Sequence, residues 1–243
     1  MQMHKIVSRD EWLVARRELL AREKALLRAN DELRRQTREL PWVKVDKSYV
    51  FEGPDGKETL ADLFAGRSQL IVKHFMLGPG WKDGCVGCSF GADQVDGSVV
   101  HLMNHDVMFV AVSRAPYPEI AAFHARMGWR FKWVSSFGSD FNFDYNVSFT
   151  ASDRARGEAF YNFRMGDYMS DEMPGLSVFY KDARGIFHTY SVFARSSEQV
   201  GGVYGLLDVT PKGRNEPPGG NLTSWVRHHD RYDDSVRPTC CDD

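Results

Sequence analysis

Two cysteines at the junction between a buried strand and a helix constrain the fold of this chain more than any other feature. Residues 70–75, Leu-Ile-Val-Lys-His-Phe, form a nearly continuous apolar run of strand length, which is typical of a central strand buried on both faces. A loop with two glycines follows, and then Cys85 and Cys88 open a helical stretch that continues to about Asn104. A close cysteine pair in this setting indicates an α/β domain in which the cysteines carry out chemistry.

The segments on either side continue an alternation of predicted strands and helices. In chain order we predict a strand at 49–51, a strand at 70–75, a helix at 85–104, a strand at 107–112, a helix at 117–128, a strand at 131–134, hairpin strands at 176–180 and 186–192, and a helix at 201–207. Strands that alternate with helices indicate a mostly parallel sheet, and the closing hairpin makes the sheet mixed. This is the order of the thioredoxin fold, so we expect an α/β, thioredoxin-like three-layer sandwich with a mixed central sheet. Residues 151–171 receive no assignment.

The two ends of the chain are predicted to extend this domain. Ser8 and Glu11 have the spacing of a helix capping box, and an amphipathic helix rich in Arg and Glu follows until Pro41 ends it. We therefore divide the chain into a helical extension at 1–40, the thioredoxin-like domain at 41–210, and a polar tail at 211–243 that packs on the domain, with Trp225 as its docking residue, or trails from it. Two interpretations of the helix stay open: it clasps its own domain, or it pairs with a second chain to form a homodimer.

The composition excludes several classes of partner. Hydrophobic residues make up 42% of the 243 residues and charged residues 26%, which is ordinary for a soluble globular protein. The formal net charge of −2 provides no basic excess for nucleic acid, no stretch approaches the roughly 18 apolar residues of a membrane helix, and residues 1–10 do not resemble a signal peptide. We therefore expect a cytoplasmic protein without a nucleic-acid or membrane partner. Because thiols stay reduced in the cytosol, a close cysteine pair there is more often catalytic or metal-binding than structural.

Cys85 and Cys88 are the candidate catalytic residues. A cysteine at a helix N-terminus is stabilised as its thiolate by free backbone N–H groups and by the helix dipole. The thiolate attacks a disulfide, and the second thiol resolves the mixed disulfide that forms. We therefore assign Cys85 as the attacking thiol and Cys88 as the resolving thiol. Asp83 is expected to oppose thiolate formation if its carboxylate lies close by.

Four further residues are candidates for supporting this chemistry. Trp81 precedes the pair and is placed to shield it. Pro174 occupies, by the order of the elements, the place of the proline whose cis peptide bond faces the cysteines in thioredoxin-like folds, although an ordinary trans bond stays open. Lys73 in the buried strand either moves protons for the resolving thiol or reaches a sheet edge and water. Arg114 supplies a positive charge at the end of the strand at 107–112, or it is a surface ion-pair partner.

The cysteines also match a metal-binding pattern. With His101 and His105 they have the C-x2-C-x12-H-x3-H spacing of a zinc finger. The core of a finger is missing, since Ala92 and Ser98 stand at the expected apolar positions. An unbroken helix rises about 1.5 Å per residue and carries His101 more than about 20 Å from the cysteines, unless it breaks near residues 96–97. We therefore expect no metal and no cofactor.

Ordered motifs along most of the chain carry a resemblance to a known family. They lie at residues 40–43, 64–70, 74–76, 84–90, 112–116, 126–129, 133–136, 138–142, 174–179 and 187–191. Together they resemble a bacterial domain-of-unknown-function family often labelled as predicted dithiol-disulfide oxidoreductases with a thioredoxin-like fold. The resemblance spans residues 12–232 and implies the fold and the cysteine centre. Members often carry Pro or another residue inside the pair, where this chain has Val86 and Gly87.

Three functions stay open at this point. The first is a thiol-disulfide oxidoreductase that acts on a disulfide-containing protein or small molecule. The second is a peroxiredoxin-like peroxidase, which needs a Ser or Thr and an Arg near its cysteine, whereas no Ser or Thr lies between Pro79 and Cys85. The third is a non-enzymatic thioredoxin-fold binding protein with unreactive cysteines. Cys240 and Cys241 near the C-terminus are idle thiols, a second resolving pair, or part of an intermolecular link.

Overall fold

The chain divides into two units, residues 1–42 and 43–243, and the computed structural model describes residues 4–168, 170–194, 202 and 226–231. The first unit holds α1 (Arg9–Arg38). Glu11 N donates to Ser8 Oγ at 3.3 Å and Ser8 N donates to Glu11 Oε2 at 2.9 Å. These bonds satisfy N–H groups that the start of a helix leaves without partners, so the predicted capping box is confirmed. The clasp and the homodimer both stay predictions.

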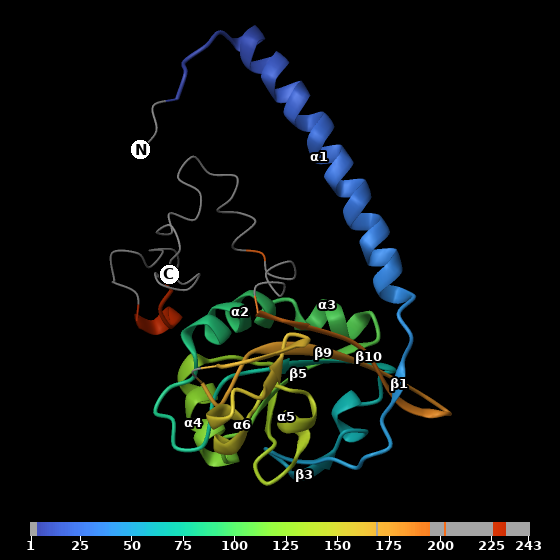
Figure 1. The fold of residues 1–243 in the computed structure, drawn as a ribbon, viewed down its shortest axis with the longest axis vertical. Coiled ribbons are helices and arrows are strands. Elements are labelled where there is room, and N and C mark those ends of the chain that lie inside the picture. Colours follow the sequence, from blue (N-terminus) through green and yellow to red (C-terminus); the bar gives the residue numbers. More distant parts are fainter. Residues whose placement is uncertain (1–3, 169, 195–201, 203–225, 232–243) are drawn as a thin grey trace, which may run out of the picture. The chain divides into compact units, whose positions relative to one another are not determined.

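An eight-stranded mixed sheet forms the centre of the second unit (Figure 1). In spatial order its strands are β1 (Val43–Lys44), β10 (Gly185–Phe193), β9 (Gly175–Asp182), β4 (Gln69–His74), β5 (Val107–Ser113), β6 (Lys132–Ser135), β2 (Val50–Gly53) and β3 (Gly56–Thr59). β5 is parallel to β4 and β6, whereas β9 is antiparallel to β4 and β10. Parallel strands linked through helices, with an antiparallel hairpin on the other side of the first strand, define the thioredoxin fold. The predicted α/β class and mixed sheet are therefore confirmed.

Helices cover both faces of this sheet. They are η1 (Asp62–Phe64), α2 (Val86–Asp96), α3 (Val99–Asn104), α4 (Tyr117–Met127), α5 (Phe141–Asp144), α6 (Ala151–Ala155) and η3 (His229–Arg231). α2 and α4 contribute Ala92 and Ile120 to one buried cluster, which also contains Phe109 of β5. η1 and α5 contribute Phe64 and Phe141 to a cluster on the other face. β5 is therefore buried on both sides, which explains its uninterrupted apolar sequence.

Some predicted elements are split or shifted. The helix expected at 85–104 breaks in two, since α2 ends at Asp96 and α3 begins at Val99. The strand expected at 49–51 is β2, which forms a hairpin with β3 around Gly56 at φ 103°. Trp225, most of the helix expected at 201–207 and most of the tail lie outside the described residues. None of the described helices combines the length and the apolar character that crossing a lipid bilayer requires.

The segment between β6 and β9, which received no full assignment, forms a packed insertion. It contains α5, α6 and a separate hairpin of β7 (Ala159–Tyr161) and β8 (Arg164–Gly166). Thr150 and Asp153 form a capping box at the start of α6. The insertion and the end of β10 share a third apolar cluster, made of Val147, Phe149, Ala159, Tyr161 and Phe193. These short elements are stabilised by a helix cap and by the apolar cluster, and none of them is long enough to show a periodic apolar pattern.

Candidate functional site

Cys85 and Cys88 lie where α2 begins, beyond the carboxyl end of β4. Cys85 is the N-cap residue of α2, and its backbone N–H donates to Met76 O at 3.0 Å. Cys88 lies in the first turn and is 3% exposed, whereas Cys85 is half-buried. Both are free thiols. The pair therefore has the predicted arrangement, with an accessible first cysteine at the helix N-terminus and a second one that faces the core.

The two thiols differ in acidity. The pKa of Cys85 falls from its usual 9.0 to about 6. The hydrogen bond from the Cys88 thiol is the largest cause, and the backbone N–H groups of Cys88 and Gly87 add to it, while burial acts in the opposite direction. The pKa of Cys88 is raised by its hydrogen bond to Cys85 and by burial. At neutral pH the pair therefore holds a thiolate at Cys85 and a thiol at Cys88.

Lys73 approaches the pair from the sheet. It belongs to β4, which pairs with β5 on one side and β9 on the other, so the predicted place at a sheet edge is wrong, whereas the half-buried side chain still has contact with water. Its Nζ lies 2.9 Å from the point that a Cβ on Gly91 would occupy, which puts the ammonium against α2. The positive charge of Lys73 lowers the pKa of both cysteines. Proton transfer by Lys73 stays a prediction.

Trp81 and Pro174 also lie in this region. Trp81 is half-buried in the apolar cluster that contains Cys85 and Cys88. Gly175 pairs with His74, so Pro174 is level with the end of β4, from which the cysteine loop departs. The described residues contain no cis peptide bond, so Pro174 has the ordinary trans bond, and the cis alternative is wrong.

Arg114 is engaged by carboxylates of the insertion. Its Nε donates to Glu172 Oε1 at 2.5 Å, and its Nη2 lies 3.4 Å from Asp171 Oδ2. Glu172 is 1% exposed and also accepts a hydrogen bond from Ser148 Oγ at 2.6 Å. Burial raises the pKa of Glu172, although Ser148 and Arg114 oppose this effect. Arg114 is thus an ion-pair partner, although the pair is partly buried and not at the surface as one alternative predicted, and it joins the end of β5 to the insertion.

The negative charge of Asp83 is balanced by two arginines. It forms ion pairs with Arg126 and, at 3.1 Å, with Arg231. Burial acts to raise the pKa of Asp83, but the hydrogen bonds from the two arginines outweigh this effect and leave the pKa below its usual range. Two positive charges therefore offset the repulsion that Asp83 was expected to exert on the Cys85 thiolate.

Two features of the site have no counterpart in the sequence prediction. Tyr161 of β7 is buried, and its hydroxyl donates a hydrogen bond to Pro174 O at 2.7 Å. Burial raises the pKa of Tyr161, and the charge of Cys88 acts in the same direction. His228 is also buried, and its Nε2 lies 2.9 Å from Gly84 O. Neither residue has a local signal, since one lies in the unassigned insertion and the other in a polar tail more than a hundred residues from the cysteines.

The helix breaks between Asp96 and Val99, where the zinc-finger spacing would require it to break. His101 lies in α3, and His105 follows its end. Within the described ranges, no three His, Cys, Asp or Glu side chains come together in an arrangement that holds a metal ion.

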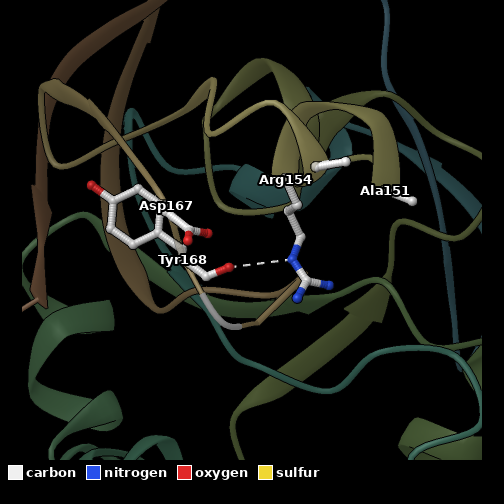
Figure 2. Close-up of a pocket in the computed structure, with 5 residues that line it drawn as sticks. Ala151, Arg154, Asp167 and Tyr168 are labelled. Atoms are coloured by element: carbon white, nitrogen blue, oxygen red, sulfur yellow. Dashed lines mark hydrogen bonds between the residues drawn. The ribbon is translucent and has the colours of Figure 1, made fainter.

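An open pocket of about 490 Å³ lies beside α6, and Figure 2 shows its lining. It is lined by Ala151, Arg154, Ala155, Asp167 and Tyr168. Arg154 Nε donates to Tyr168 O at 3.2 Å across the pocket wall. The lining includes neither cysteine and none of the residues predicted to support them.

The fold and the site define a class, a thioredoxin-fold protein with a cysteine pair at the N-terminus of the helix that follows its central strand. Within this class, the chain belongs to the family described as bacterial protein of unknown function (DUF899), whose model matches residues 1–232. The predicted family resemblance is confirmed. No curated protein matches the sequence significantly.

Several solved structures are similar to this chain at low identity. Peroxidoxin BcpB from Mycobacterium tuberculosis is 11% identical, with a TM-score of 0.45 over 63% of this chain and 85% of that one. The bacterioferritin comigratory protein from Xanthomonas campestris is 11% identical, with a TM-score of 0.46 over 67% of this chain and 92% of that one. A candidate thiol:disulfide interchange protein, DsbE, from Chlorobium tepidum is 13% identical, with a TM-score of 0.42 over 66% of this chain and 92% of that one. The fold assignment rests on the strand order described above.

Proposed function

We propose that this protein is a thiol-disulfide oxidoreductase whose redox centre is the Cys85–Cys88 pair. The observation that carries the proposal is the difference in acidity between the two thiols. Cys85 has a pKa of about 6 at the N-terminus of α2, whereas the pKa of the buried Cys88 is raised. The thiolate form is the nucleophile in disulfide exchange. At neutral pH the pair therefore has one nucleophile, Cys85, and beside it one protonated thiol, Cys88, that can resolve the mixed disulfide.

The proposed reaction proceeds in two exchanges. The Cys85 thiolate attacks one sulfur of a substrate disulfide, a mixed disulfide forms, and the first substrate thiolate leaves and takes up a proton from water. Cys88 then loses its proton to water and attacks the Cys85 sulfur, which releases the second substrate group as a thiolate that takes up a proton from water. The substrate is reduced by two electrons, and the enzyme ends with the Cys85–Cys88 disulfide. The substrate class is a disulfide-containing protein or small molecule, and the proposed compartment is the cytoplasm.

Three neighbouring side chains are proposed to support these steps. Lys73 favours thiolates at both cysteines by its positive charge, which eases the loss of the Cys88 proton before the second exchange. Trp81 shields the pair within their common apolar cluster. Pro174, directly before β9 and level with the end of β4, helps to present the backbone of the substrate segment that carries the disulfide.

The peroxidase alternative has less support in the described site. A peroxidatic cysteine needs a cation to polarise the peroxide, and Arg114, the cation predicted for this role, is bound to Glu172 and Asp171. The loop between Pro79 and Cys85 contains no Ser or Thr. A purely binding function is disfavoured because a lowered thiol pKa is typical of reactive rather than structural cysteines.

Trapping of a mixed disulfide tests the proposal. Glutathione disulfide is the probe, and the variants are Cys88→Ser and Cys85→Ser. We expect Cys88→Ser to retain one glutathione on Cys85, identified by the mass of its peptide, because the resolving thiol is missing. Cys85→Ser should retain none on Cys88, because that thiol is buried and protonated. Absence of an adduct from folded Cys88→Ser would refute the proposed function.

A further inference from the structure

A short C-terminal segment, residues 226–231, lies against the loop that leads to Cys85. It includes η3, which contacts α2, and the red part of Figure 1 shows the two side by side. Val226 is 1% exposed and His228 is 3% exposed. The segment is therefore part of the core around the cysteines, although more than a hundred residues separate it from them in sequence.

Ion pairs fix this segment to the elements that surround Cys85. His229 Nδ1 lies 2.6 Å from Asp93 Oδ1 of α2. Arg126 of α4 binds Asp230 at 2.8 Å, and Arg231 binds Asp83 at 3.1 Å. The two arginine–aspartate contacts join opposite charges, and His229 adds a polar contact with Asp93. Several such contacts together hold a short segment better than one exposed pair does.

The buried contact of the segment is made by His228. Its ring packs edge-on against Phe123, with the ring centroids 5.4 Å apart. Its Nε2 lies 2.9 Å from Gly84 O, and since a carbonyl oxygen only accepts hydrogen bonds, Nε2 carries the proton in this contact.

Both sides of the peptide unit between Gly84 and Cys85 are therefore held. The carbonyl oxygen of Gly84 accepts from His228 at 2.9 Å, and the N–H of Cys85 donates to Met76 O at 3.0 Å. The Cα of Cys85 is bonded to this peptide unit, so holding the unit restricts the positions from which the Cys85 side chain can project. That side chain must face the N–H groups of Gly87 and Cys88 for its thiolate to be stabilised.

We propose that His228 is a positioning residue of the dithiol, which holds the Gly84–Cys85 peptide so that the Cys85 thiolate stays aligned with the backbone N–H groups of the first turn of α2. This inference rests on the proposed redox function of the pair. It assigns part of the redox site to a segment at the far end of the chain. Stabilising the thiolate favours the reduced pair, so loss of the hydrogen bond makes the thiolate less stable and the pair more reducing.

Two substitutions separate the hydrogen bond from the packing. His228→Phe keeps a ring against Phe123 but has no donor, whereas His228→Gln keeps an N–H donor without the ring. The measurements on the full-length protein are the rate at which iodoacetamide alkylates Cys85 at pH 6.5 and the reduction potential of the pair in glutathione buffers. We expect His228→Phe to slow alkylation about two- to tenfold, the range that one net hydrogen bond supplies, and to make the potential more negative. His228→Gln should stay closer to the unsubstituted protein in both measurements.

The outcomes separate this inference from the proposed function. If the unsubstituted protein shows no reversible dithiol transition, the proposed function fails, and this inference fails with it. If that transition is present but folded His228→Phe matches the unsubstituted protein, or if Phe and Gln shift both measurements equally, His228 has only a packing role. Should His228→Phe not fold, His228→Met, which matches Gln in size without a donor, makes the same comparison.

Discussion

The acidity of a single sulfur determines what the cysteine pair does at neutral pH. With a pKa of about 6, Cys85 is mostly thiolate at pH 7, whereas a thiol of pKa 9.0 is only about 1% ionised there. Attack on disulfides is fastest for thiols whose pKa lies near the ambient pH, because a more acidic thiolate is a weaker nucleophile. Cys85 is therefore close to the acidity at which exchange in a neutral compartment is most efficient.

The pH dependence of alkylation tests this acidity. In the unsubstituted protein we expect the rate of Cys85 alkylation by iodoacetamide to rise with pH through a midpoint of about 6. Cys88→Ala removes the largest cause of the low pKa, so its midpoint should lie at higher pH. Cys88→Ser keeps a hydroxyl donor and should shift less. A midpoint between pH 8 and 9 in the unsubstituted protein would contradict the assignment of Cys85 as the attacking thiol.

Lys73 provides a second test at this scale. Lys73→Met removes the positive charge beside both sulfurs, so the pKa of Cys85 should rise. Gly91→Ala introduces a Cβ at the position 2.9 Å from Nζ, so it should displace the ammonium and shift the pKa in the same direction by less. Lys181→Met is the control, because Lys181 Nζ donates to Ala61 O on another part of the sheet. Unchanged alkylation profiles in both Lys73→Met and Gly91→Ala would show that Lys73 has no effect on the pair.

At the scale of elements, the approach of the loop to α2 depends on a glycine. A Cβ on Gly84 would lie 2.7 Å from Phe75 Cε1 and 2.9 Å from Phe123 Cε1. Both rings belong to the buried cluster on this face of the sheet, so neither moves without disturbing its neighbours.

Gly84→Ala should therefore lower the free energy of unfolding by about 1–3 kcal/mol, as overpacking of a core does. Urea unfolding is the measurement. Gly97→Ala is the matched control, because a Cβ there has no neighbour within 4 Å, and its effect should stay within about 0.5 kcal/mol. Equal stabilities for the two variants would show that the loop adapts to the extra methyl group.

The insertion is joined to the start of β9 through Tyr161. Its hydroxyl donates to Pro174 O at 2.7 Å and accepts from Ala194 N at 3.0 Å. Tyr161→Phe removes both of these hydrogen bonds, so we expect a loss of about 1–3 kcal/mol in urea unfolding, at about 0.5–1.5 kcal/mol for each net hydrogen bond. Tyr168→Phe is the control, since its hydroxyl makes one longer bond, 3.2 Å to Tyr161 O. A larger loss in the control than in Tyr161→Phe would contradict this assignment.

The elements also show which parts of the structure are predictable from the sequence. β4 and β5 are predictable because strands buried on both faces carry a continuous apolar run, and α1 is predictable because its capping box is local. The insertion has strands of three residues and helices of four and five residues, which are too short for periodicity to show. The contact of His228 with Gly84 depends on the folding of the whole domain, so no local pattern indicates it.

At the scale of the whole molecule, the site combines parts from distant regions of the sequence. β4 supplies Lys73, α2 supplies the cysteines, the insertion supplies Tyr161, and the C-terminal segment supplies His228. Cys240 and Cys241 lie outside the described residues, and their three predicted alternatives stay open.

The reduction potential should depend on pH in two regimes. Below the Cys85 pKa of about 6, reduction of the disulfide takes up two protons, and above it only one, because Cys85 stays ionised. The potential should therefore fall by about 59 mV per pH unit below pH 6 and by about 30 mV per unit above it. A constant slope of about 59 mV from pH 5 to pH 8 would show that no low-pKa thiolate exists in the reduced protein.

The central claim, that Cys85 and Cys88 form a working redox dithiol, is tested most directly by a redox titration at pH 7. The full-length protein is equilibrated in glutathione and dithiothreitol buffers, free thiols are trapped, and the Cys85–Cys88 peptide is followed by mass. We predict a reversible two-electron transition of this peptide that is lost in Cys85→Ser. A peptide that stays fully reduced at every potential in the folded protein would contradict the claim and leave a thioredoxin-fold binding protein.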